Sequence, residues 1–379
     1  MLSLSPPASL ISATITRVQG TPEYRSDEAK ARAAAAFSNA FGDATNKTVV
    51  QDIRKLCDSI RLISAGFVEV GNDLMNFDSQ RFKDRDDRFL QLRPNWDYFH
   101  NEFSRAIEHS LKNAVDAIGF IQHISSILSD DISGCTYKEL LEEFQSSILP
   151  RVDHRRKEDA GFGEFISGLI DKLNRFSDEI DAALRPADQD LIVKLAEVRA
   201  ARKTHLDKLN VIIDEVKALG IACTGALAIG GDAAIVTMTT LAPLGVFMAV
   251  EPALTALGTK SGIEDKKKDI QVAEVEIEAR SNEFAALIDS HPFFKKYSKN
   301  FEEHRARINA VVPQLQALTS IWETISCDMH HFAAQLEFRA KESSMINGLT
   351  LKKAQNTGVI YRRLKVMLEC YSELVISRY

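Results

Sequence analysis

The sequence lacks the features that mark several large classes of protein. Its five cysteines, Cys57, Cys135, Cys223, Cys327 and Cys370, are odd in number and far apart, which argues against a disulfide framework and fits synthesis in a reducing compartment. Lys and Arg number 47 against 53 Asp and Glu, giving a net charge of -6. Without a clustered basic excess, no nucleic-acid partner is expected. Charged residues make up 26% and hydrophobic residues 45%, so disorder is not expected either.

A secretory signal is also missing from the opening residues, MLSLSPPASLISATITRVQG. No positive residue precedes the apolar ones, and Pro6-Pro7 interrupts them. We therefore expect cytoplasmic synthesis without a standard signal peptide. If the chain is secreted, another route must release it.

Motifs of enzyme chemistry do not occur. Gly225 and Gly230 have the spacing of phosphate-loop glycines, but Gly231-Asp232 stands where Lys and Ser or Thr are needed. The nearest approach to a metal set, Cys327 with His330 and His331, has no evident fourth ligand. We therefore predict no enzyme, no catalytic residue, no cofactor, no metal site and no small-molecule substrate.

Long amphipathic periodicity is what the sequence does contain. Apolar residues recur at three- and four-residue steps over 45–93, over a second run that Asn95 could cap, and over 188–217 and 261–290. Runs of this length predict helices of about 45 to 75 Å, which can only lie side by side. The predicted fold class is all-α, an elongated antiparallel bundle of long helices.

One stretch departs from this pattern. From Leu219 to Val250 the only charge is Asp232. Residues 233–250 form a helix of about 27 Å if continuous, close to the hydrocarbon thickness of about 30 Å. A buried Asp near the bilayer centre costs about 2.5 to 3.5 kcal/mol, so Asp232 must lie at a turn.

Three parts of the chain are therefore predicted. Residues 1–22 are a flexible N-terminus, 23–217 and 259–379 a long-helix tail bundle, and 218–258 a hydrophobic head hairpin at one end of the rod. The hairpin could be helical or a short β-tongue, since its residues fit both. Neighbouring helices must cover it until release, because an exposed patch of this size would aggregate.

The candidate site residues lie in this hairpin. The membrane-inserting candidates are its large apolar residues, Leu219, Ile221, Leu227, Ile229, Ile235, Val236, Met238, Leu241, Leu244, Val246, Phe247, Met248 and Val250. The hinge and turn candidates are Gly220, Gly225, Gly230, Gly231, Asp232, Pro243, Gly245, Pro252 and Gly258.

Two long amphipathic runs, Asp188 to Lys217 and Ser261 to Ser290, flank an apolar hairpin in an almost wholly helical chain. This arrangement resembles the α-helical pore-forming toxins of the cytolysin A and haemolysin BL superfamily, and in size the Xax/Yax-type two-component subunits. The resemblance covers roughly residues 45–379 and rests on architecture rather than on a short motif. In cytolysin A the N-terminal helix lines the pore, whereas residues 1–20 here carry Pro6-Pro7.

The resemblance implies a monomer that is soluble until it meets a target-cell membrane. There it inserts its hairpin and forms a homo-oligomer, a lytic and haemolytic transmembrane pore, alone or with a second toxin subunit. The alternative is a soluble helical scaffold or interaction protein whose apolar stretch is simply buried core.

Overall fold

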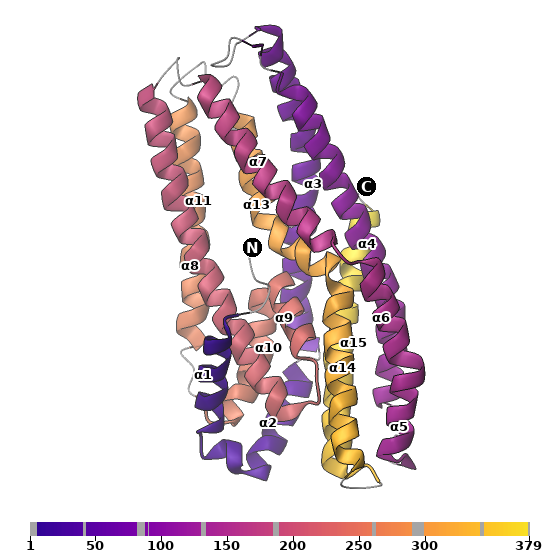
Figure 1. The fold of residues 1–379 in the computed structure, drawn as a ribbon. Coiled ribbons are helices and arrows are strands. Elements are labelled where there is room, and N and C mark those ends of the chain that lie inside the picture. The colour runs from indigo at the N-terminus through magenta and orange to yellow at the C-terminus, as the bar shows by residue number, and fades with distance from the viewer. Residues whose placement is uncertain are drawn as a thin grey trace.

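The computed structural model describes residues 6–40, 43–81, 88–89, 91–129, 134–184, 189–259, 263–289, 299–341 and 345–377. These residues form an elongated bundle of helices, with no β-strand among them (Figure 1). The elements are α1 (Ala8–Gln19), the 3-10 turn η1 (Glu23–Arg25), α2 (Asp27–Ala40), α3 (Asp43–Ser79), α4 (Arg93–Ser129), α5 (Tyr137–Glu143), the π-helical turn η3 (Phe144–Ile148), α6 (Leu149–Glu158), α7 (Phe162–Leu184), α8 (Gln189–Leu227), α9 (Asp232–Leu241), α10 (Pro243–Ala256), α11 (Ile263–Asp289), α13 (Lys299–Thr319), α14 (Ile321–Ala340) and α15 (Gly348–Ile376). The all-α bundle predicted from periodicity is confirmed.

The boundary between α3 and α4 differs from the prediction. The first long helix ends at Ser79 rather than near Arg93, and α4 begins at Arg93, so Asn95 lies inside it and is not its cap. The cap is supplied by Asp78, whose carboxylate accepts hydrogen bonds from the amides of Leu92 (2.8 Å) and Arg93 (3.0 Å). A residue at the end of one helix therefore satisfies the orphan amides of the next.

Some helix breaks in the later part of the chain coincide with a proline or glycine, and others do not. Pro150 lies at the start of α6, and Gly161, with φ 93°, precedes α7. Pro313 lies inside α13, and the chain leaves the helix at Ser320 before α14 begins.

An aromatic cluster joins α3, α4, α7 and α13 in the tail. Trp96 donates its indole N–H to the carbonyl oxygen of Phe67 (2.8 Å), and its ring lies 5.5 Å from Phe301 and 6.1 Å from Phe176. His304 packs edge-on against Phe67, and burial lowers its pKa to about 3. The neutral imidazole therefore behaves as part of the apolar core at ordinary pH.

The N-terminal segment is structured from Ala8 onward, contrary to the expectation of a flexible opening. α1 packs against α8, and α2 packs against α10. Thr21, in the connection, donates its hydroxyl to the carbonyl of Leu257 at the end of α10 (2.6 Å). Alanines at positions 29, 33 and 34 of α2 are buried, so this helix can lie close to its neighbour. The weak local pattern gave no sign of these long-range contacts.

The cap on α4 leads to a stability prediction. Asp78→Ala should lower the free energy of unfolding by about 1 kcal/mol, because two amides at the start of α4 lose their acceptor. Urea denaturation followed by circular dichroism should show a lower midpoint with an unchanged slope. The matched control is Asp207→Ala, an exposed aspartate on α8. Equal effects of the two substitutions would contradict a capping role for Asp78.

Candidate functional site

The apolar stretch forms a buried helical hairpin. Its two short helices, α9 and α10, follow the end of α8, so the hairpin is helical and contains no β-tongue in this structure. The hairpin is not a protruding tip: α9 contacts α3, α8, α13, α14 and α15, and α10 contacts α2, α3 and α8. Figure 1 shows both helices in the lower half of the bundle, between α8 on one side and α14 and α15 on the other. "The apolar hairpin" below means residues 218–258.

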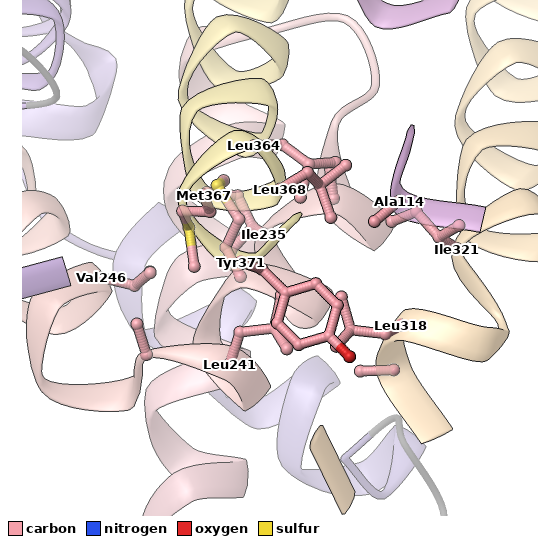
Figure 2. Packing of buried hydrophobic residues seen from close by; sticks show 14 of the residues in the cluster. Ala114, Ile235, Leu241, Val246, Leu318, Ile321, Leu364, Met367, Leu368 and Tyr371 are labelled. Carbon is pink, nitrogen blue, oxygen red and sulfur yellow. The ribbon is translucent and has the colours of Figure 1, made fainter. Parts of the chain in front are cut away.

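Side chains of the apolar hairpin belong to the common core of the protein. In Figure 2, Ile235, Leu241 and Val246 lie in the same cluster as Met367 and Tyr371 of α15. Most candidate inserting residues are buried in the same way: Leu219, Leu227, Ile229, Ile235, Val236, Met238, Leu241, Val246, Phe247 and Val250. Ile221 and Leu244 are half-buried, and Met248 is 39% exposed. Neighbouring helices thus cover the hairpin.

Glycines in the left-handed conformation stand at both ends of the α9–α10 pair. Gly230 and Gly231 have φ values of 80° and 93° and make the turn into α9, with Asp232 as its first residue. Gly258, with φ 76°, follows α10. These three positions favour glycine because an L side chain is strained there. The turn predicted at Gly230-Gly231-Asp232 is observed.

The remaining hinge candidates have other roles in this conformation. Pro243 begins α10, whereas Gly220, Gly225, Gly245 and Pro252 lie inside helices. A Cβ on Gly220 would lie 2.5 Å from Cγ2 of Ile235, and one on Gly245 would lie 2.7 Å from Cγ2 of Val49. These two glycines therefore permit close helix packing rather than a bend.

The N-terminus of α9 is capped by a carboxylate from another helix. No side chain of α9's own N-cap residue, Gly231, can serve. Instead Asp328 of α14 accepts hydrogen bonds from the amides of Ala233 (3.0 Å) and Ala234 (3.0 Å). Tyr361 of α15 donates its hydroxyl to the same carboxylate (3.0 Å). One buried side chain thus joins α9, α14 and α15.

Two further side chains of α15 hold the turn before α9. Thr357 accepts a hydrogen bond from the amide of Ile229 (3.2 Å) and donates one to its carbonyl (3.0 Å). Asn356 donates to the carbonyl of Leu227 (2.7 Å). The backbone at the turn therefore depends on α15 for its polar partners.

The N-terminus of α10 is also capped from outside the hairpin. Its N-cap residue Ala242 has no side-chain acceptor, and Asp52 of α3 accepts a hydrogen bond from the amide of Gly245. Asp328 and Asp52, named here the cap carboxylates, thus supply to the two hairpin helices what their own sequences lack.

Burial controls the charge of these carboxylates. It raises the pKa of Asp328 to about 6, although the hydrogen bonds from α9 and Tyr361 oppose that rise. Burial likewise raises the pKa of Asp52 and of Asp232, whose carboxylate also accepts a hydrogen bond from Thr224. No Lys, Arg or His in the described part of the chain forms an ion pair with Asp328. The rise in its pKa is therefore opposed by amide and hydroxyl dipoles and not by a cation.

Sequence reasoning did not find the cap carboxylates or the polar residues of α15. A signal for Asp328 was present, since it is an acidic residue between Ile325 and Phe332 on the apolar face of a helix. His330, from the rejected metal set, contacts Asp153 of α6 instead (3.0 Å). Among the described residues, no three His, Cys, Asp or Glu side chains are placed to share a metal ion.

The described chain is therefore an all-α elongated bundle around a buried apolar hairpin. No protein-family model and no curated protein matches it. Its structure is similar to the pre-pore of AhlB from the tripartite α-pore forming toxin AHL of Aeromonas hydrophila, with a TM-score of 0.40 and 14% identity over 88% of this chain and 98% of that chain. It is also similar to the AhlB pore (TM-score 0.37, 16% identity, 87% and 97% covered) and to the SmhB pore of the tripartite toxin Smh of Serratia marcescens (0.32, 16%, 84% and 98%). These values describe a likeness in helical architecture and do not define what this chain does.

The contacts of the turn lead to a second stability prediction. Thr357→Val should lower the free energy of unfolding by about 2 kcal/mol, because it leaves the buried amide and carbonyl of Ile229 without partners. Thr204→Val is the control, since Thr204 is exposed and bonds only within its own helix. Its effect should stay within about 0.5 kcal/mol in the same urea titration. A neutral result for Thr357→Val would mean that α15 does not hold the turn.

Proposed function

We propose that this chain is a subunit of an α-helical pore-forming toxin. In the proposed mechanism the apolar hairpin leaves the bundle at a target membrane and inserts, and the chains then assemble into a lytic pore, alone or with a partner subunit. The insertion involves the large apolar residues named above, and Gly230, Gly231 and Gly258 are its hinges.

One observation carries this proposal: the hairpin contains a long segment without charge whose threonine hydroxyls are in part satisfied within their own helix. Residues 233–250 have no charge. The hydroxyls of Thr239 and Thr240 donate to the carbonyls of Ile235 (2.8 Å) and Val236 (3.0 Å) within α9 itself. Internal satisfaction of polar groups is the condition for a segment that enters a bilayer.

Insertion requires a change of helix length. None of the helices in the described residues is both long enough and apolar enough to cross a membrane. We propose that α9 and α10 join through residues 242–243 into one helix, of about 27 Å over 233–250. The other arm is the end of α8, which residues 211–217 lengthen, with Asp214, Glu215 and Lys217 facing water or protein.

A second candidate function is a helical scaffold that binds other proteins. The observation in its favour is that the hairpin shares one core with α15 and leaves no separate head. In that case the hairpin never moves, and locking it in place has no functional effect.

A reversible lock distinguishes the two candidates. Thr237 of α9 and Thr324 of α14 share a hydrogen bond of 3.0 Å between their hydroxyl oxygens. Replacing both, Thr237→Cys with Thr324→Cys, should allow a disulfide, because the longer carbon–sulfur bonds bring the sulfurs within reach of a bond of about 2.05 Å. We expect the oxidised double variant to release no dye from phosphatidylcholine–phosphatidylserine–sterol vesicles, and reduction to restore release.

The two single substitutions, given the same oxidant, are the controls and should release dye like the unmodified chain. Full release by the oxidised double variant would reject the hairpin as the inserting element. No release by the unmodified chain, at any pH or lipid composition and with or without a co-encoded partner, would reject pore formation and favour the scaffold.

A further inference from the structure

Two carboxylates, the buried Asp328 and the half-buried Asp52, cap the two helices of the apolar hairpin. Neither forms an ion pair with a buried cation in the described part of the chain. Asp328 is 2% exposed and faces Asp232 at the same helix terminus. Asp52 is near Lys55 of its own helix (3.8 Å), but Lys55 is exposed, and Glu274 of α11 opposes it. Each site thus places an acidic group where ionisation is costly and protonation is not.

We propose that Asp328 and Asp52 make release of the apolar hairpin dependent on pH, with the hairpin held more firmly in acid than at neutral pH. This inference rests on the proposed function in assuming that the hairpin leaves the bundle. It adds the condition under which it leaves. The direction follows from comparing the two states of the hairpin.

In the closed state, burial raises the pKa of Asp328 to about 6, and in the open state the carboxyl is hydrated and returns to its ordinary value. Between those two values the closed state binds more protons than the open state. Acid therefore favours closure, and the advantage is lost as pH rises through about 6. Asp52 acts in the same direction because burial raises its pKa too.

Other titratable groups around Asp328 do not reverse this direction. On α9, burial raises the pKa of Asp232, and the nearby His331 opposes that rise without outweighing it. On α15, burial and the nearby carboxylate raise the pKa of Tyr361 well above its usual range, and on α14 burial raises that of Cys327. Both stay neutral across the range in question.

The pair of His330 on α14 and Asp153 on α6 responds to pH in the opposite direction. The hydrogen bond from His330 holds the pKa of Asp153 below its usual range, so acid weakens the contact between α14 and α6. This pair does not touch α9. Its substitution therefore provides a matched control on the same helix.

Hydrogen–deuterium exchange of the full chain in solution, without membrane, tests the proposal. After correction for intrinsic exchange, amides of residues 228–241 should become about tenfold less protected between about pH 5 and about pH 7.5. Peptides from α4 serve as the internal reference for global unfolding. Asp328→Asn should remove most of this pH dependence, and Asp153→Asn should retain it.

Tyr361→Phe provides a second test in case Asp328→Asn does not fold. It keeps the carboxylate but removes a hydrogen bond that favours its charged form, so the midpoint of the pH dependence should move to higher pH. Constant protection, higher protection at neutral pH, or an unchanged response in Asp328→Asn would overturn the proposal. Because no vesicle is present, a hairpin that opens with pH but releases no dye would reject the pore and leave the pH dependence standing.

Discussion

Covering the uncharged segment between Asp232 and Glu251 is the constraint on which the rest of the structure depends. Its large side chains each gain about 1.5 to 3 kcal/mol on removal from water, so no arrangement that leaves them exposed is stable. The surrounding helices satisfy most of this requirement, with α2 and α3 against α10, and α14 and α15 against α9. The bundle is organised around the hairpin rather than beside it.

Apolar packing is not directional, so polar contacts must define where the hairpin lies. α9 and α10 are too short to be stable as isolated helices in water. Neither has a capping side chain of its own, and both receive one from a longer helix, Asp328 from α14 and Asp52 from α3. The same device appears between α3 and α4, where Asp78 caps the next helix. The position and the helicity of the hairpin thus depend on contacts with the neighbouring helices.

Periodicity was sufficient to predict the helices and the class of fold, because long amphipathic helices in water bury their apolar faces by packing side by side. The turn at Gly230-Gly231 was also predictable. The charge of Asp232 disfavours a continuous apolar helix, and the two glycines before it can adopt the backbone conformations of a turn. The set of helices that surrounds the hairpin was not predictable. Which faces meet depends on contacts such as Thr357 with Ile229, between residues 128 positions apart, and local pattern carries no information about them. The order of α1 was missed for the same reason.

Buried acids are an expensive way to cap a helix if stability is the only requirement. An asparagine or serine could accept an amide hydrogen bond without the desolvation cost that raises the pKa of Asp328 to about 6. The cost is present only while the hairpin is closed and the carboxyl is ionised, so it lowers the free-energy difference between the closed and open states at neutral pH without removing a single apolar contact. The proposed release of the hairpin needs a term of this kind. It opposes closure at neutral pH and not in acid, and it acts at the N-termini of α9 and α10.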